Sequence, residues 1–222
     1  MLIERSMHPE WLSNAYLVAD EPGGTAVFVD SGAPLAPLHA VVEREQLTVT
    51  HLLTTHGHHD HVAGDDELVE RYGAQIVKGA LETGGLRIQA LETPGHSDDH
   101  LCYVVNDIVC FTADVLFRDA VGGGPDATPI RRSVMDVLMT LPPELRVLPG
   151  HTEETTIERE WEENPFVTFW RGEAASIDEK VRVTGADATL LVWSPDYDGK
   201  GKALVRFADG HEAIVGGSRV ER

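Results

Sequence analysis

Four potential metal ligands lie within six residues of the chain, at His56, His58, Asp60 and His61. They follow the apolar run 49–54, which predicts a buried strand, so the ligands come where that strand ends. Alternate side chains of an extended chain share a face, so His56 and His58 can converge on one ion. Asp60 and His61, beyond the bend, can serve a second ion. Imidazole with carboxylate favours zinc or iron over calcium or magnesium. The alternative is a solvated His-rich loop.

The same pattern recurs at three later positions, where an apolar run ends, the chain turns and a ligand-type residue follows. These residues are His96, Asp114 and His151. A Pro-Gly pair precedes both histidines, and such a turn lets a side chain project from the end of a strand. Ligands from several strands can meet at one sheet edge although they are far apart in sequence. The joint pattern favours a metal centre over a set of unrelated structural histidines.

The composition is that of a soluble globular protein and excludes some partners. A chain of 222 residues can bury a full core, and its 18 Lys plus Arg against 37 Asp plus Glu give a formal charge of −19. That charge argues against nucleic acid or an anionic membrane as a partner. The first residues hold no apolar core of signal-peptide length, and no later run approaches a membrane span. We therefore expect a cytoplasmic protein with a small-molecule substrate, and a homodimer remains open.

Strand and helix patterns alternate up to about residue 172. Strands are expected at 14–19, 25–30, 49–54, 75–78, 86–91, 101–105, 108–111 and 146–148, and helices at 34–46, 65–72, 131–140 and 155–163. This alternation indicates an α/β domain with helices outside the sheets. Beyond it, three strands are expected at 188–193, 203–207 and 212–215. The predicted organisation is a catalytic domain over 1–172 and a small all-β appendage over 173–222.

Three further polar residues near the ligands are not expected to bind metal. Asp30 stands at a strand-to-turn junction, where a carboxylate more often caps backbone amides. His59 fills the position between two ligands and either orients one of them or faces solvent. His100 is expected to be structural or to support a ligand.

The pattern His56-x-His58-x-Asp60-His61, continued by His96, Asp114 and His151, resembles the complete ligand set of the metallo-β-lactamase superfamily. Other segments are similar to its glyoxalase II (hydroxyacylglutathione hydrolase) branch: TPGHS at 93–97, HLCY at 100–103, FTADVLF at 111–117, PGHT at 149–152 and NPF at 164–166. The resemblance covers about residues 10–170.

This resemblance implies an αββα sandwich with two divalent metal ions at one edge, zinc first, with iron or manganese as alternatives. Metal one would be held by His56, His58 and His96, metal two by Asp60, His61 and His151, and Asp114 would bridge them. A hydroxide shared by the ions would be the nucleophile, because bound cations bring the pKa of water toward neutrality. Asp60 would take up its proton and is the candidate catalytic residue.

The implied function is hydrolysis of thioesters of a low-molecular-weight thiol, because a thiolate leaves readily. The thiol itself stays open, because the segment 118–125 departs from the family pattern and the helical domain that grips glutathione is absent. One alternative is a persulfide dioxygenase with a single iron on His56, His96 and Asp114. Others are a lactonase and a non-catalytic metal-binding sensor or interaction module. The Gly-rich loop 122–124 is expected to act as a mobile lid.

Overall fold

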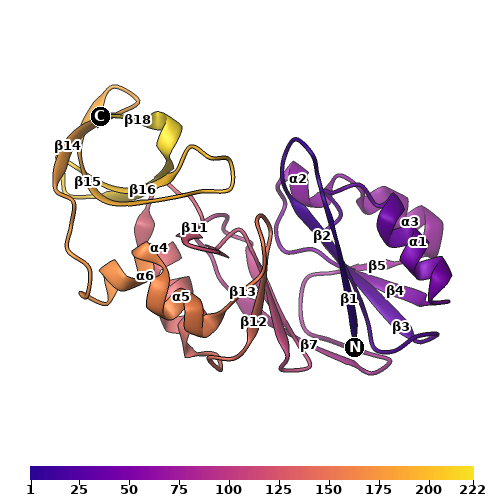
Figure 1. The fold of residues 1–222 in the computed structure, drawn as a ribbon. Helices are drawn as coiled ribbons and strands as arrows, with labels where there is room; N and C mark the ends of the chain where they lie inside the picture. Colours follow the sequence, from indigo (N-terminus) through magenta and orange to yellow (C-terminus); the bar gives the residue numbers. More distant parts are fainter.

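The computed structural model describes residues 1–222 as two sheets packed face to face, with helices on both outer faces and a third sheet at the C-terminal end (Figure 1). The first sheet has the order β1-β2-β3-β4-β5, the second β13-β12-β9-β8-β7-β6 and the third β17-β16-β15-β14-β18. No helix is both long enough and apolar enough to cross a bilayer.

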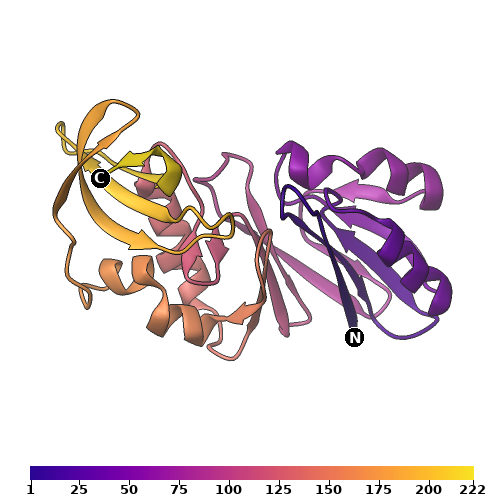
Figure 2. The same ribbon diagram turned by 45° about the horizontal axis from the view of Figure 1, so that its top comes forward.

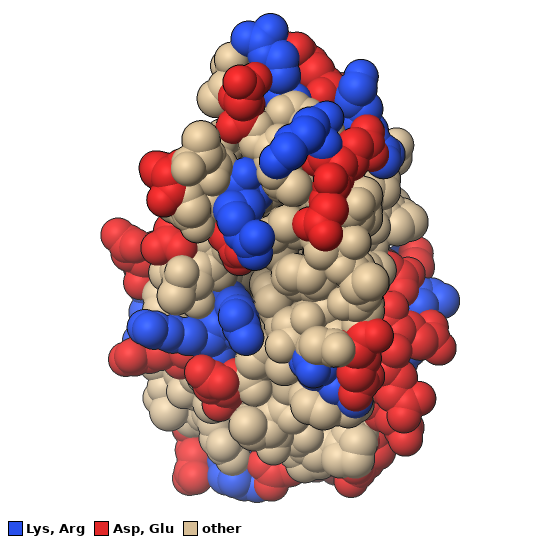
Figure 3. Space-filling view, turned by 90° about the vertical axis from the view of Figure 1, so that its left-hand side faces the viewer, with Lys and Arg blue, Asp and Glu red and all other residues tan.

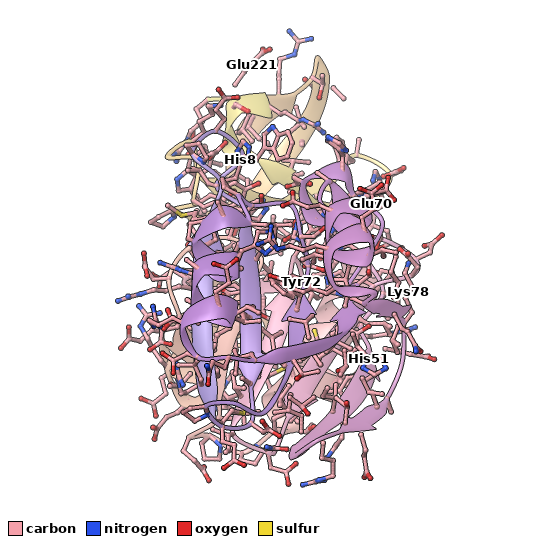
Figure 4. The ribbon with its side chains drawn as sticks, turned by 90° about the vertical axis from the view of Figure 1, so that its right-hand side faces the viewer. His8, His51, Glu70, Tyr72, Lys78 and Glu221 are labelled. Atoms are coloured by element: carbon pink, nitrogen blue, oxygen red, sulfur yellow. The ribbon has the colours of Figure 1, made fainter.

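The first sheet is covered on its outer face by two helices. Its strands are β1 (Leu2–Met7), β2 (Asn14–Ala19), β3 (Thr25–Val29), β4 (Thr48–Leu53) and β5 (Gln75–Val77). Strands β3, β4 and β5 run parallel, so the chain must cross over between them, and it does so through α1 (Ala36–Arg44) and α3 (Asp65–Tyr72). Figure 4 views this helical layer, where Tyr72 of α3 bonds through its hydroxyl to His39 Nδ1 of α1 at 2.8 Å.

The second sheet comprises β6 (Leu81–Thr83), β7 (Leu86–Glu92), β8 (Leu101–Val105), β9 (Val109–Ala113), β12 (Arg146–Pro149) and β13 (Thr155–Thr156). A short hairpin, β10 (Leu116–Phe117) and β11 (Ala120–Val121), follows β9. The helices of this half are α4 (Ala127–Arg132), α5 (Ile157–Glu163) and α6 (Pro165–Trp170). Irregular helical turns at Ser133–Val137 and Leu138–Thr140 follow α4.

Strands in both sheets bury both of their faces. In β8, Tyr103 and Val105 point into the core between the sheets, whereas Cys102 and Val104 point toward the helices. Side chains alternate between faces along a strand, so a strand buried on both sides reads as a continuous apolar run. The core between the sheets consists of Tyr16, Val18, Val27, Val29, Leu53, Leu86, Ile88, Tyr103, Val105, Val109, Phe111 and Leu148.

The C-terminal sheet is curled and antiparallel, with β14 (Glu179–Val183), β15 (Ala186–Ser194), β16 (Lys202–Phe207), β17 (Glu212–Gly216) and β18 (Val220–Glu221). Leu191, Leu204 and Ile214 belong to the same buried cluster as Ile130 and Phe166 of the helical layer. Figure 2 shows the β15–β16 turn projecting from this sheet toward the tip between β1 and β2, as it also does in Figure 1.

The expected αββα architecture with an additional C-terminal β-sheet is confirmed, and several elements differ from the prediction. Helix α6 was not predicted: Pro165 cannot continue α5, but its fixed backbone angle suits the first position of a new helix, which it occupies. Strand β1 was missed because charged residues interrupt its apolar positions, which an edge strand tolerates. The helix expected at 131–140 is helical throughout, but it begins earlier, at Ala127, and only α4 (Ala127–Arg132) is a regular α-helix. The C-terminal sheet has β14 and β18 besides the three expected strands.

A buried carboxylate joins α5 to its surroundings. Glu160 is 0% exposed and accepts hydrogen bonds at Oε1 from Thr155 Oγ1 at 2.6 Å and Arg159 Nη1 at 2.7 Å. Its Oε2 accepts from the Asp119 backbone N–H and from Asn164 Nδ2, both at 2.9 Å. Asn164 is also the N-cap of α6, so Glu160 positions the junction of the two helices.

We expect Glu160→Ala to lower the free energy of unfolding by about 3 kcal/mol, because it leaves buried donors without an acceptor. Denaturant unfolding measures the change. The matched control is Glu158→Ala, an exposed glutamate of the same helix, which should change stability by less than about 0.5 kcal/mol. Equal effects of the two substitutions would contradict a structural role for the Glu160 network.

Candidate metal centre

The seven residues expected to bind metal come together at one edge of the sandwich. Four strand ends deliver them: β4 leads into residues 56–61, β7 into His96, β9 into Asp114 and β12 into His151. The three groups with ligand atoms within 4.8 Å of one another are His56, His58 and His96; His56, His61 and Asp114; and Asp60, His61 and His151. Every residue of the predicted set therefore belongs to at least one group.

Three imidazoles form the first group. His58 Nδ1 lies 3.0 Å from His56 Nε2 and 2.9 Å from His96 Nε2, so three ring nitrogens point at a common position. His56 and His58 flank Gly57 in the extended segment after β4, and their side chains reach the same side as the strand period predicts. This set of nitrogens is suited to zinc or another divalent transition metal.

Asp114 lies between two metal groups, the first formed by His56, His58 and His96 and the second by Asp60, His61 and His151. Its Oδ1 is 3.3 Å from His61 Nε2, and its Oδ2 is 3.4 Å from both His96 Nε2 and His151 Nε2. Asp60 Oδ2 is 3.5 Å from His151 Nε2 and 3.8 Å from His61 Nε2. The two oxygens of Asp114 thus face nitrogens from both groups, as a bridging carboxylate requires.

The chemistry of these side chains fits divalent cations. His61 Nε2 and Asp114 Oδ1 are buried and have no hydrogen-bond partner, which is costly unless an ion takes the partner's place. Burial and the neighbouring His61 lower the pKa of His56 to about 2, so its ring is neutral and has a lone pair to donate. Burial alone would raise the pKa of Asp114, but the neighbouring His61 and His151 hold this pKa well below its usual range.

Residues behind the ligands hold them in place. Asp30 accepts a hydrogen bond from the Thr55 backbone N–H at 2.9 Å, as expected for a capping residue, and its Oδ2 lies 2.8 Å from His61 Nδ1. His100 Nε2 accepts the Asp114 backbone N–H at 3.2 Å. Both residues therefore orient ligands, and the His61 contact of Asp30 was not anticipated. His59 is exposed, and its ring meets Trp11 edge-on at 5.1 Å between centroids.

Gly150 is required where β12 ends, because the ligands approach its backbone closely. A Cβ built there would lie 2.3 Å from Asp114 Oδ1 and 2.8 Å from His61 Cε1. Any side chain would push the Asp114 carboxylate away from its neighbours. The Pro-Gly pair before His151 thus has a packing reason in addition to its turn geometry.

The expected mobile lid at 122–124 is wrong, because this loop is bonded on both sides. Gly124 exchanges two backbone hydrogen bonds with Ile214 of β17, at 2.9 and 3.0 Å. The Gly122 N–H donates to the Val115 carbonyl at 3.2 Å, and the Gly123 carbonyl lies 3.1 Å from His96 Nδ1. The loop is therefore a fixed support for His96, held by the C-terminal sheet.

The β15–β16 turn brings a second part of the C-terminal sheet to the centre. The ring of Tyr197 stacks on that of His151, with centroids 4.0 Å apart and planes at 5°. Burial raises the pKa of Tyr197, and Asp114 and Asp196 add to this, so its hydroxyl stays protonated. Asp196 also pairs with Lys202 at 2.9 Å. Tyr197 could not be predicted as part of the site, because no sequence pattern in its turn indicates that it lies near residue 151.

A large groove lies elsewhere, on the C-terminal sheet. It measures about 870 Å³ and is lined by residues that include Lys180, Arg182, Arg206 and Arg222. Arg206 pairs with Glu212 at 2.8 Å and Arg222 with Glu179 at 2.5 Å, and Figure 3 shows the two signs of charge interspersed on this face. Exposed pairs of this kind leave little free positive charge for an anionic ligand.

The sequence is similar to that of a known protein family and of several known proteins. The family model described as "Metallo-beta-lactamase superfamily" matches residues 8–84. An uncharacterised protein of Mycobacterium tuberculosis is 30% identical over 207 residues, which cover 69% of this chain and 92% of that protein. A hydroxyacylglutathione hydrolase of Rhodopseudomonas palustris is 34% identical over 156 residues. That match covers 61% of each chain.

Solved structures with the same fold include ETHE1 from Myxococcus xanthus, at 31% identity and a TM-score of 0.67, with 76% of this chain and 85% of that chain covered. TTHA1623 in a di-iron-bound form is 28% identical with a TM-score of 0.63, covering 73% of this chain and 99% of that one. The ligand geometry, the sandwich and the relatives agree. The chain belongs to the metallo-β-lactamase superfamily.

Proposed function

We propose that the protein is a metal-dependent hydrolase that cleaves thioesters of a low-molecular-weight thiol. The observation that carries this proposal is the convergence of all seven ligand-type side chains into two groups joined by Asp114. Two groups at this spacing suit a pair of ions acting together. Relatives named hydroxyacylglutathione hydrolase support the thioester as the bond that is cleaved.

The proposed roles follow from the positions of the side chains. His56, His58 and His96 would hold one ion, Asp60, His61 and His151 the other, and Asp114 both. When bound, the ions would polarise the substrate carbonyl and lower the pKa of an attacking water. Asp60, whose side chain is 30% exposed, can accept the proton of that water. The leaving thiolate needs no strong general acid, because thiols are themselves acidic.

The thiol part of the substrate is not specified by the likeness to hydroxyacylglutathione hydrolases. The chain covers 61% of the length of such a relative, and in this chain residues 179–221 form a β-sheet. Recognition of the thiol therefore depends on this protein's own surface. Glutathione, mycothiol and bacillithiol are all candidates, and we propose no choice among them on this basis.

The second candidate is a persulfide dioxygenase with one iron on His56, His96 and Asp114. The likeness to ETHE1 from Myxococcus xanthus supports it. The closeness of Asp60, His61 and His151 favours the hydrolase, because a single-iron enzyme has no use for a second group. The likeness to a di-iron form of TTHA1623 favours two ions as well.

Metal content and turnover decide between the two candidates. We expect about two zinc or iron equivalents per chain on elemental analysis of protein purified without chelator. We also expect hydrolysis of at least one of S-lactoylglutathione and S-acetyl-N-acetylcysteamine, and its loss after metal removal. One iron per chain, with oxygen consumed on addition of glutathione persulfide, would establish the dioxygenase instead.

Asp114→Ala should remove both ions and reduce activity at least about 1,000-fold, because each ion loses a charged ligand and two buried imidazoles lose their counter-charge. Elemental analysis after gel filtration and thioesterase assays measure the two losses. Asp66→Ala, which removes an exposed acid at the start of α3, is the control and should keep metal and activity. Normal metal content in Asp114→Ala would refute the bridging role.

A further inference from the structure

His151 differs from the other buried ligands in how its ring is held. A ligand histidine normally uses its second ring nitrogen to bond a carbonyl or carboxylate, which fixes the orientation of the ring. His61 Nδ1 has Asp30 at 2.8 Å and His96 Nδ1 has the Gly123 carbonyl at 3.1 Å. His151 is 1% exposed, and its Nδ1 has no hydrogen-bond partner. Something other than a hydrogen bond must orient this ring.

Aromatic rings, instead of a hydrogen bond, orient the His151 side chain. Tyr197 lies flat against the His151 ring at 4.0 Å, and Phe117 meets the same ring edge-on at 5.8 Å. Phe117 and Tyr197 also contact each other at 5.8 Å. The imidazole is thus confined by two larger rings, and one of them comes from the C-terminal sheet.

The turn that carries Tyr197 is itself anchored. Asp196 accepts a hydrogen bond from the Tyr197 backbone N–H at 3.0 Å and pairs with Lys202 Nζ at 2.9 Å. The side chains of this pair are 4% and 10% exposed, so solvent weakens it little. Ser194, before the turn, donates a hydrogen bond to the Asp119 carbonyl. Tyr197 is therefore held against His151 by contacts on both sides of the turn.

The hydroxyl of Tyr197 is free, unlike those of the other three tyrosines. Tyr16 donates to the Pro149 carbonyl at 2.7 Å, Tyr103 to the Thr54 carbonyl at 2.9 Å, and Tyr72 bonds His39 at 2.8 Å. No protein group bonds the Tyr197 hydroxyl. Besides burial, the charges of Asp114 and Asp60 raise the pKa of this phenol, so its hydroxyl lies near the carboxylates of the metal centre.

We propose that Tyr197 acts on the metal centre in two ways: its ring positions His151, and its hydroxyl donates a hydrogen bond to an oxygen of the acyl substrate. The second role rests on the proposed thioesterase function, whereas the first does not. The C-terminal sheet is then one wall of the active site. The β15–β16 turn faces the tip between β1 and β2 in both ribbon views (Figures 1 and 2), and Trp11 in that tip is 37% exposed and contacts His59.

The role of the ring is tested by metal binding, without any substrate. Tyr197→Ala should weaken binding of the second of two cobalt ions about 10-fold in competition with a chelator, because His151 is no longer confined. It should also change the visible spectrum of the cobalt-loaded protein. Tyr197→Phe keeps the ring and should match the wild type in both measurements. Tyr197→Leu, which keeps apolar volume, serves as a second variant should alanine loosen the turn.

The role of the hydroxyl is tested by kinetics of the metal-loaded enzyme with S-lactoylglutathione and S-acetyl-N-acetylcysteamine. Tyr197→Phe should lower kcat/KM about 10-fold, with the loss carried by KM, because one hydrogen bond to bound substrate is missing. The matched control is Tyr72→Phe, which removes a phenol hydroxyl in the α1–α3 layer and should leave kcat/KM unchanged.

Each outcome bears on one role. Wild-type cobalt affinity and spectrum in Tyr197→Ala and Tyr197→Leu would overturn the positioning of His151. Wild-type kcat/KM in Tyr197→Phe would overturn the substrate contact. Absence of thioester turnover by the wild type would reject the proposed function and the hydroxyl contact with it, while the cobalt measurements would still decide the role of the ring.

Discussion

The negative charge of the buried Asp114 carboxylate constrains the side chains around it at the metal centre. Asp114 is 5% exposed and lies within 3.4 Å of ring nitrogens of His61, His96 and His151. A buried carboxylate among imidazoles, two of which have a ring nitrogen without a hydrogen-bond partner, needs compensating positive charge. Divalent cations supply that charge and satisfy both kinds of ligand. The fold must hold these side chains together although they repel or desolvate one another in the absence of an ion.

The strands of the sandwich hold these side chains together. The ligands stand just past the ends of β4, β7, β9 and β12, and these strands are fixed by a core that is buried on both sheet faces. Small displacements at a strand end would cost packing in that core, so the ligand positions follow from the packing of residues far from the edge. Gly150 shows how little room remains, because even a methyl group there would meet Asp114 Oδ1.

The α/β alternation and the candidate ligands could be predicted from the sequence, because both depend on local patterns, whereas the αββα sandwich was implied by the resemblance to the metallo-β-lactamase superfamily. His56 and His58 share a strand period, and Pro-Gly turns mark His96 and His151. Contacts between distant segments could not be predicted in this way. Asp30 was correctly expected to cap an amide, but its bond to His61 spans 31 residues and follows only from the arrangement of β3 and β4. The Gly-rich loop suggested mobility by composition, whereas its pairing with Ile214 depends on where the C-terminal sheet docks.

Because the C-terminal sheet docks at this position, it supports residues of both metal groups. Through Ile214 and Gly124 it fixes the loop whose carbonyl faces His96, a member of the first group. Through Tyr197 it covers His151, a member of the second. Ile214 pairs with Leu204, and Lys202, two residues before Leu204, bonds Asp196 of the turn that carries Tyr197. Both contacts therefore come from one end of the sheet, and a shift of the sheet would disturb both groups together. Variation in the β15–β16 turn, in contrast, would alter the wall beside His151 and leave the support of His96 intact. The ends of the core strands thus position the candidate metal ligands, whereas the turn that covers one of them belongs to a separate sheet.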